Sequence, residues 1–196
     1  MEQINLKKQI LTYLYDFIEK PSVSDSDAEH LGADWLQETL KNQPYFQVHP
    51  EDCGSYEIPG DYRKRHIVYG LVKGGTDRTV ILTGHYDVVG IEEYGALKSL
   101  AFQVEKLTEA MKTAPLDEES RKDLESGEWL FGRGTADMKG GLCAGLAVLW
   151  QIGEEVLAGT FQGKVNVLFM AVPDEESYSA GMRGAAGLLQ ELRKSR

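Results

Sequence analysis

Residues 164–177 read KVNVLFMAVPDEES, an apolar run followed at once by three consecutive acidic residues. An apolar run of this kind is typical of a strand covered on both faces, as in the sheet of an α/β protein. The shorter run TVILT at residues 79–83 has the same character. Helical patterns occupy residues 142–155, between the two runs, and residues 184–192, after the second. This alternation predicts an α/β fold whose functional groups lie at the carboxyl ends of the strands.

The sequence pattern of the first half of the chain predicts further helices and strands. Apolar residues at helical spacing indicate a helix that ends before Pro21, and the stretch SVSDSD offers caps for a second helix over residues 28–40. A short strand is expected at Tyr45–Val48, followed by a loop, and a longer strand at His66–Val72. The acidic segment 91–128 is expected to be an excursion from the sheet. It has helical patterns only at residues 102–111 and 116–124.

The composition is that of a folded protein of about one domain, with 196 residues of which 42% are hydrophobic and 27% charged. Acidic residues outnumber basic ones 31 to 21, and the net charge of −10 argues against nucleic acids and anionic membrane surfaces as partners. No apolar run is long enough to predict a transmembrane helix. The two cysteines, Cys53 and Cys143, form no C-x-x-C pair, so neither a cysteine zinc site nor a disulfide scaffold is expected. Because such a chain suits a reducing compartment, a cytoplasmic location is the default expectation.

The first candidate site is the tetrapeptide GHYD, which follows the run at residues 79–83. His85 and Asp87 are two positions apart, so in an extended chain their side chains project to the same side. A metal-bound imidazole usually donates its second N–H to a carboxylate or a carbonyl, and Asp87 is a candidate for that role. For the tetrapeptide alone, a strand end whose His and Asp bond to loop backbone is the more common explanation.

The second candidate site is the Gly-rich stretch GRGTADMKGG at residues 132–141. Its glycines permit a close approach of the backbone to a ligand, and Asp137 could bridge two cations just before a helix. An aspartate that caps the following helix is an equally good explanation. A Gly-rich turn before a helix also suits phosphate, but neither nucleotide-binding motif is matched here.

The third candidate site is the PDEES segment at residues 173–177. Acidic residues packed side by side cost free energy unless cations or donors offset them. Because neighbouring residues point in different directions, one of Glu175 and Glu176 could bind a metal while the other faces a bound water. A solvated acidic loop is an equally good explanation of this segment alone.

Together the three segments offer one imidazole and several carboxylates without a cysteine, a ligand set suited to hydrolytic zinc, manganese or cobalt. Such a metal lowers the pKa of a bound water, and a free glutamate beside it can remove and return the proton. The sequence contains no G-x-S-x-G motif, and neither cysteine lies in a catalytic motif. The other histidines, His30, His49 and His66, are interpreted as surface or packing residues.

The motifs GHYDVV, GRGTADMKGG and PDEES occur in this order across residues 84–177 and resemble those of the co-catalytic zinc amidohydrolase and exopeptidase family. That family includes aminoacylase, acetylornithine deacetylase, succinyl-diaminopimelate desuccinylase and glutamate carboxypeptidase. The resemblance implies a three-layer sandwich with a mixed, mostly parallel central sheet and helices on both faces. Within the family, PYFQVHP, DVVGIEEYGALKSLAF and SGEWLFGRGTADM resemble the bacterial arginine-utilisation subgroup, and segment 91–128 resembles an insertion of that subgroup.

Carried onto this sequence, the resemblance implies two zinc ions per complete site, with cobalt or manganese as alternatives. His85 would bind one zinc, Glu176 would bind the other, and Asp137 would bridge both. In structures of the family the peptide bond after the bridging aspartate is cis. Asp87 would hold the imidazole of His85, and Glu175 would act as the general base. The implied reaction is hydrolysis of the amide bond of an N-acyl amino acid or a small peptide.

The resemblance also implies parts that residues 1–196 do not include. Family members carry a further carboxylate ligand and a second histidine later in the chain, and a lid or dimerisation domain. Residues 1–196 are therefore expected to be the N-terminal portion of the catalytic α/β domain, incomplete at the C-terminus. By themselves they should bind metal weakly and turn over little substrate, and a homodimer is a candidate assembly for the full-length protein. A catalytically silent binding or regulatory relative is the alternative, and a nucleotide-binding enzyme is a more remote one.

Overall fold

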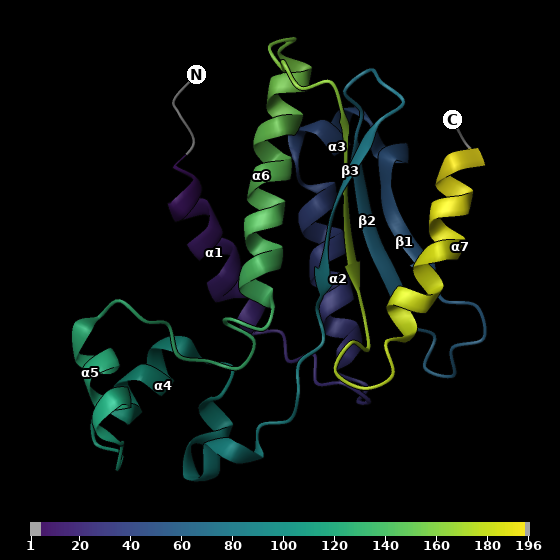
Figure 1. The fold of residues 1–196 in the computed structure, drawn as a ribbon. Coiled ribbons are helices and arrows are strands. Elements are labelled where there is room, and N and C mark those ends of the chain that lie inside the picture. Colours follow the sequence, from purple (N-terminus) through teal and green to yellow (C-terminus); the bar gives the residue numbers. More distant parts are fainter. Residues whose placement is uncertain (1–4, 195–196) are drawn as a thin grey trace.

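The computed structural model describes residues 5–194, which form one sheet with helices on both faces (Figure 1). Four strands form the sheet in the order β1-β2-β4-β3. They are β1 (Cys53–Glu57), β2 (His66–Val72), β3 (Thr79–His85) and β4 (Asn166–Val172). The helices are α1 (Leu6–Ile18), α2 (Glu29–Lys41), α3 (Pro44–Val48), α4 (Val104–Met111), α5 (Glu118–Ser126), α6 (Lys139–Leu157) and α7 (Ala180–Lys194), with 3-10 segments η1 (Pro50–Asp52) and η2 (Glu92–Leu100).

The sheet is mixed, but most of its strand pairs are antiparallel. β1 pairs with β2, and β2 with β4, in antiparallel fashion, whereas β3 and β4 run parallel with His85 opposite Val172. The turn after β2 sends the chain back, so β3 runs opposite to β2, and β4 inserts between them. The expected mixed sheet with helices on both faces is confirmed. Its mostly parallel character is not found among the described strands, where only the β3–β4 pair is parallel.

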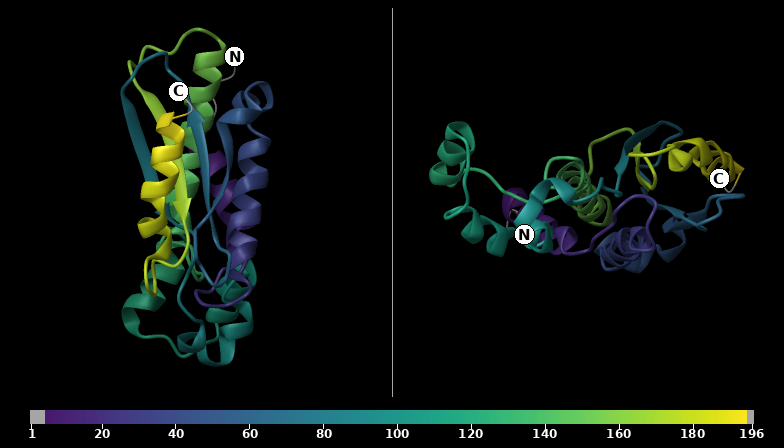
Figure 2. Two further views of the ribbon diagram at one scale, coloured as in Figure 1. Left: turned by 90° about the vertical axis from the view of Figure 1, so that its right-hand side faces the viewer. Right: turned by 90° about the horizontal axis from the view of Figure 1, so that it is seen from below.

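The strand β4 is buried along its whole length, as its apolar run predicts. Val167, Phe169 and Ala171 belong to a core that includes residues of α1, α2, α3 and α6. Met170 and Val172 instead pack with residues of α7. Figure 2 shows the corresponding arrangement, with α7 on one side of the sheet and α2 and α6 on the other. The fold therefore has the three layers that were expected.

The strand β3 lies at the edge of the sheet and is more exposed than its sequence predicts. Val80 and Ile81 keep 47% and 42% of their surface exposed. The helix α6 contacts β3, whereas α7 packs on β2 and β4. The prediction that TVILT is covered on both faces is therefore wrong for the described residues, because this edge strand lies beyond the helix that covers its neighbours.

Two expectations for the segment between α2 and β2 are wrong. Tyr45–Val48 is predicted to be a strand, but it lies in the helix α3. Pro44 occupies the first position of this helix, where its fixed φ is already helical and its missing N–H is not needed. Tyr45 and Phe46 are thereby buried in the core. The expected loop after them contains β1, which pairs with β2.

The helix α6 packs against α1, α3 and the sheet. Gly153 lies against α3, since a Cβ atom at this position would be 2.8 Å from Tyr45 Cβ. The absence of a side chain at this position therefore allows the two helices to approach closely. Among residues 5–194, no helix has both the length and the apolar character needed to cross a membrane.

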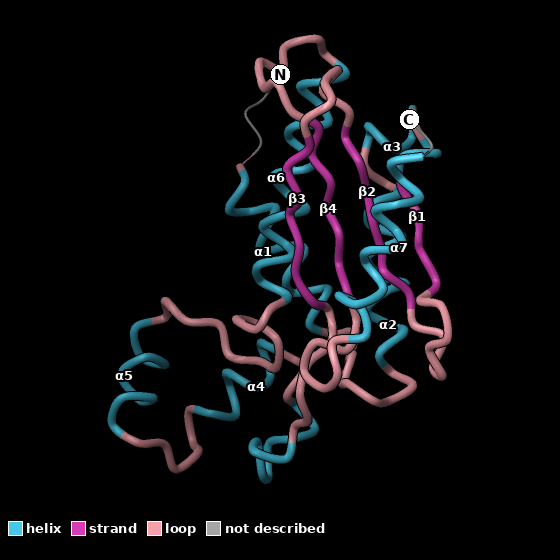
Figure 3. Tube along the Cα trace, turned by 45° about the vertical axis from the view of Figure 1, so that its right-hand side comes forward, coloured by secondary structure: helices cyan, strands magenta, loops and turns pink. Residues whose placement is uncertain are grey.

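Residues 91–128 contain η2, α4 and α5 and contribute no strand to the sheet. The helices α4 and α5 overlap the expected patterns at residues 102–111 and 116–124, whereas η2 lies where no helical pattern is expected. This segment lies to the side of the sandwich, beyond the carboxyl ends of β3 and β4 (Figures 1 and 3). Val104 and Leu107 of α4 are buried, and Val104 belongs to the main core. The start of α4 therefore anchors the segment to the sandwich.

Candidate metal centre

The three candidate segments meet at the carboxyl end of the parallel strand pair. The strand β3 ends at His85, directly beside Val172 at the end of β4. Glu175 and Glu176 follow in the loop after β4, and Asp137 lies in the turn before α6. Because parallel neighbours end at the same edge of a sheet, these side chains gather there.

The side chains of His85, Asp137 and Glu176 form a compact group of ligand-type atoms. One nitrogen or oxygen atom of each residue lies within 4.8 Å of those of the other two. His85 Nε2 is 3.0 Å from Asp137 Oδ1, and it is 3.8 Å from Glu175 Oε2. His85 is buried, whereas Asp137 is largely exposed, so the group is open to solvent on one side. One imidazole with several carboxylates is a donor set that zinc, cobalt or manganese can use.

The surroundings of His85 favour its protonated form. Burial lowers the pKa of His85, but hydrogen bonds with Asp87 and Asp137 raise it more strongly, to about 9. Its Nδ1 is 3.0 Å from the backbone carbonyl oxygen of Asp87 and 3.6 Å from Asp87 Oδ1. The carbonyl oxygen therefore orients the ring, and a metal ion at Nε2 would have to displace a proton.

Asp87 is fully buried, and its carboxylate connects three segments. Ser24 Oγ donates to Oδ2 at 2.7 Å. The backbone amides of Glu175 and Glu176 donate to Oδ1 and Oδ2, each at 3.1 Å. Burial raises the pKa of Asp87, but the nearby His85 ring and the hydrogen bonds from Ser24 and the two amides lower it below its ordinary value overall. The side-chain carboxylate of Asp87 thus accepts hydrogen bonds from the backbone of both glutamates. The backbone carbonyl oxygen of Asp87 lies within hydrogen-bond distance of the His85 ring.

Negative charge accumulates around Glu176. Burial raises the pKa of its carboxyl group, and the carboxylates of Asp137, Asp87 and Glu175 raise it further, against an opposing effect of His85. Like charges at this spacing cost free energy unless a cation or hydrogen-bond donors offset them. A divalent cation would supply that offset, so the electrostatics of these residues fit a bound metal.

The Gly-rich turn before α6 is anchored by a buried lysine. Lys139 Nζ donates to the backbone carbonyl oxygens of Phe17 at 3.1 Å and Lys20 at 2.6 Å, at the end of α1. Burial lowers the pKa of Lys139 to about 7. The Asp137–Met138 peptide bond is cis, as the family resemblance implies. The turn is therefore fixed against α1 while the side chain of Asp137 stays exposed.

Sequence motifs do not identify most of the residues that hold the candidate ligands. Ser24 lies in the stretch SVSDSD, which the sequence marks only as a source of helix caps. Arg65, Glu29 and Asp61 lie outside all the motifs. The structure joins these three charged residues to Asp174 in a buried ion cluster beside the β4–α7 loop.

A second group of ligand-type atoms consists of His49, Glu51 and Asp52. Lys73 Nζ is 2.5 Å from Asp52 Oδ1, and the hydroxyl of Tyr45 donates to Asp52 Oδ2. A lysine therefore already supplies a positive charge to this group. The interpretation of His49 as an ordinary histidine stays a prediction.

A three-layer α/β fold with a group of metal-ligand type at the end of a parallel strand pair fits the broad class of metal-dependent enzymes. Within that class the chain belongs to the peptidase family M20/M25/M40, because the sequence profile of the family matches residues 81–196. This range contains His85, Asp137, Glu175 and Glu176. The family resemblance is confirmed, and family membership supports a metal-dependent hydrolase.

Two proteins of Bacillus subtilis are similar to this chain in sequence. Protein RocB is 37% identical over 200 residues, which cover all of this chain and 34% of RocB. The uncharacterized protein YqjN is 40% identical over 190 residues, which cover 96% of this chain and 33% of YqjN. The chain thus spans about a third of the length of the curated relatives it matches.

Solved peptidase structures share the fold. Dug1p, a di-peptidase from Saccharomyces cerevisiae, superposes with a TM-score of 0.60 at 20% identity, over 90% of this chain and 34% of Dug1p. Human carnosine dipeptidase 1 gives a TM-score of 0.59 at 15% identity, over 90% of this chain and 34% of the dipeptidase. The M20 family metallo-carboxypeptidase Sso-CP2 of Sulfolobus solfataricus gives 0.56 at 21% identity, over 86% of this chain and 31% of Sso-CP2. At these identities the likeness concerns the fold.

Proposed function

We propose that this chain carries part of a two-metal site in a hydrolase that cleaves the amide bond of an N-acyl amino acid or a small peptide. The observation that carries the proposal is the grouping of ligand-type atoms from His85, Asp137 and Glu176 within 4.8 Å of one another. Membership in a peptidase family supports the same class of reaction.

Each member of the group has a separate role in this proposal. His85 binds one metal ion, Glu176 binds the other, and Asp137 bridges the two. Zinc suits this donor set, with cobalt or manganese as alternatives. When bound, such ions polarise a carbonyl and lower the pKa of a water molecule. The carbonyl of Asp87 fixes the His85 ring through Nδ1, which leaves Nε2 directed towards Asp137.

Glu175 is the proposed general base. Its Oε2 lies 3.8 Å from His85 Nε2, beside the proposed ligands, and 49% of its side chain is exposed. The hydrogen bond from its backbone amide to Asp87 fixes its position in the loop. In the proposal its carboxylate takes a proton from the attacking water and returns it to the leaving amine nitrogen.

The proposal also concerns a longer protein that contains this chain. Residues 1–196 form the N-terminal portion of the catalytic domain, and residues 91–128 are an insertion of the arginine-utilisation subgroup, an assignment that the similarity to RocB supports. The remaining metal ligands and a lid or dimerisation domain belong to the rest of a longer chain that forms a homodimer. The isolated chain therefore binds metal weakly and has little activity.

The test is the zinc content per chain after dialysis, measured by elemental analysis on the longest natural form of the protein that contains this sequence. The wild type should hold about two zinc ions. Asp137→Asn should lose them, because an amide is a poor bridging ligand. Asp34→Asn, which alters an exposed aspartate of α2, serves as the matched control and should keep both ions. Residues 1–196 alone should bind less zinc than the long form.

Two results would contradict the proposal. One is equal zinc in the wild type and Asp137→Asn, because the bridging role would then be absent. The other is no binding in the long form even after reloading with zinc, manganese or cobalt. In that case the catalytically silent binding relative would be the better account.

A further inference from the structure

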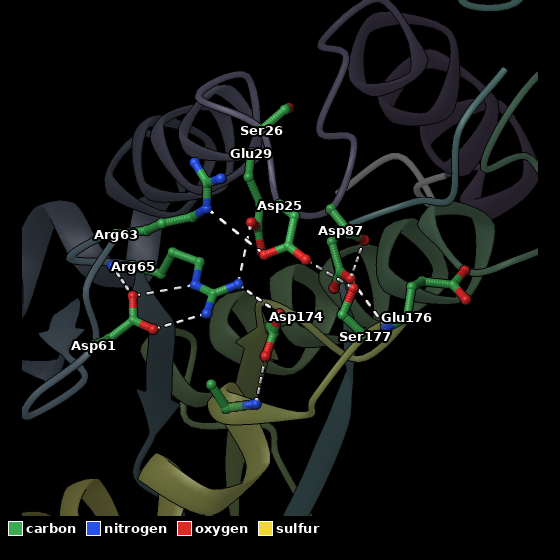
Figure 4. Close-up of polar contacts among 12 residues, drawn as sticks. Asp25, Ser26, Glu29, Asp61, Arg63, Arg65, Asp87, Asp174, Glu176 and Ser177 are labelled. Carbon is green, nitrogen blue, oxygen red and sulfur yellow. Dashed lines mark hydrogen bonds and ion pairs between the residues drawn. The ribbon is translucent and has the colours of Figure 1, made fainter.

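Arg65 is a buried arginine just before β2, and carboxylates from three segments surround it (Figure 4). Its Nε and Nη2 donate to the two oxygens of Asp61 at 3.1 and 2.7 Å. Its Nη1 donates to Asp174 Oδ1 at 2.6 Å and to Glu29 Oε2 at 3.4 Å. Arg65 therefore joins α2, the turn before β2 and the β4–α7 loop.

Asp174 links this ion cluster to the proposed site. It is fully buried, directly precedes Glu175 and has a φ of 65°, a conformation that costs free energy for a residue with a side chain. Its Oδ1 accepts from Arg65, and its Oδ2 accepts from the backbone amide of Ala180 at 2.9 Å, at the start of α7. The carboxylate of Asp174, at the start of the loop that carries the glutamates, thus bonds both to the end of that loop at Ala180 and to Arg65 outside it.

Glu175 and Glu176 lie next to this anchor and are held by a second one. Their backbone amides donate to Asp87, as Figure 4 shows for Glu176. In the same view the side chain of Glu176 points away from Arg65. The path from Arg65 to the two glutamates therefore runs through Asp174 and the backbone.

The arrangement requires an arginine rather than any positive charge. A guanidinium carries its N–H donors in a rigid planar fork, so one edge can bond Asp61 while Nη1 reaches Asp174. Lysine would keep the charge, but its compact ammonium cannot hold both carboxylates in this geometry. Buried ion pairs add little net stability, because desolvation offsets the attraction. Fixing one loop geometry is therefore the use that best fits this cluster.

We propose that Arg65 is a positioning residue which, through Asp174, fixes the loop geometry in which Glu176 binds a metal and Glu175 acts as the base. This inference rests on the proposed function. It makes the metal affinity of the site depend on a residue that is not itself a ligand.

The test measures the dissociation constant and the visible absorption spectrum of Co²⁺, added alone to the longest natural form of the protein. Arg65→Lys is compared with the wild type, with Glu176→Gln, and with the control Arg121→Lys. Arg121 belongs to α5, where it donates to the backbone oxygens of Lys112 and Ala114. Circular dichroism and the thermal midpoint of the metal-free proteins establish that each variant is folded.

In folded Arg65→Lys the dissociation constant for Co²⁺ should rise by about tenfold or more, because residues that support metal ligands have effects of this size. The absorption spectrum of bound Co²⁺ should change as well. Arg121→Lys should match the wild type. A purely structural role of Arg65 would move the thermal midpoint and leave the affinity and the spectrum unchanged. That result overturns the inference, and it leaves the proposed function in place if Glu176→Gln loses binding.

A wild type that binds Co²⁺ no better than Glu176→Gln would instead overturn the proposed function, together with the inference that rests on it. If Arg65→Lys does not fold, Asp61→Asn takes its place. That variant keeps Arg65 and Asp174 but removes the charge that holds the guanidinium fork. Weaker Co²⁺ binding and an altered spectrum are again expected, and unchanged binding overturns the inference.

Discussion

Glu175 and Glu176 are neighbours in the chain but have different surroundings. Glu175 is exposed, whereas Glu176 is partly enclosed and lies within 4.8 Å of ligand-type atoms of His85 and Asp137. Burial and neighbouring carboxylates raise the pKa of Glu176, and adjacent residues point in different directions. Glu176 can therefore bind a metal ion while Glu175 contacts a water molecule.

Replacing Glu175 by glutamine should separate these two roles. Glu175→Gln keeps the size of the side chain but removes the proton acceptor, so kcat for amide hydrolysis should fall by about 10²- to 10⁴-fold. Zinc content should stay at the wild-type level. Both quantities can be measured on the same preparation, with Glu191→Gln on the exposed side of α7 as the control. An unchanged kcat would exclude the general-base role, and a loss of zinc would make Glu175 a ligand.

Sequence motifs predict which side chains gather at the site, but they do not predict what holds them there. His85, Asp137 and Glu176 each lie where a strand ends or a helix is about to begin, and local patterns can detect such places. The hydrogen bond of Arg65 to Asp174 spans 109 positions, and no local pattern contains it. The meeting of the His85 ring with the carbonyl of Asp87 likewise depends on tertiary geometry.

Among the elements, those with long and regular patterns are predicted well. The strand β2 has the expected bounds, His66–Val72, and the helices α2 and α6 lie close to their predicted ranges. The helix α3 and the strand β1 have five residues each, and packing decides their conformation more than local preference does. Exposure of β3 could not be predicted either, because it depends on which strands α7 covers.

The contact between α3 and α6 predicts the effect of a single added methyl group. Gly153→Ala would bring a Cβ atom to 2.8 Å from Tyr45 Cβ, which belongs to the rigid base of a buried side chain. The helices must then move apart, and we expect a loss of about 1–3 kcal/mol despite the higher helix propensity of alanine. Urea unfolding measures this loss, with Gln151→Ala, two residues earlier on the exposed side of α6, as the control. A stabilised Gly153→Ala would show that the helices adapt without strain.

For the whole molecule, the ion cluster around Arg65 couples folding to pH. One guanidinium faces the carboxylates of Glu29, Asp61 and Asp174, and all four side chains are nearly inaccessible to solvent. Burial raises the pKa of Glu29 to about 7, with further contributions from Asp87 and Asp174 and an opposing effect of Arg65. In the unfolded chain this carboxyl group titrates near its ordinary pKa of 4.5.

Between these two pKa values the folded state keeps the Glu29 proton, while the unfolded state has lost it. Stability contributed by Glu29 is therefore fully present below about pH 4.5 and is lost as the pH rises towards about 7, by an amount on the order of 3 kcal/mol. Glu29→Gln has no proton to lose. The free energy of unfolding of the wild type minus that of Glu29→Gln should thus be larger at about pH 5 than at about pH 8. A difference that stays constant over this range would contradict the raised pKa.

Asp87 joins residues that are far apart along the chain, since Ser24 lies 63 positions before it and Glu176 lies 89 positions after it. Both intervening loops must close before the carboxylate has its partners, and closing long loops costs conformational entropy. Helices form faster than such distant pairings. We therefore expect α1, α2 and α6 to form early, and the candidate ligands to meet only after β4 has entered between β2 and β3. A newly synthesised chain would thus gain most of its secondary structure before it can hold a metal ion.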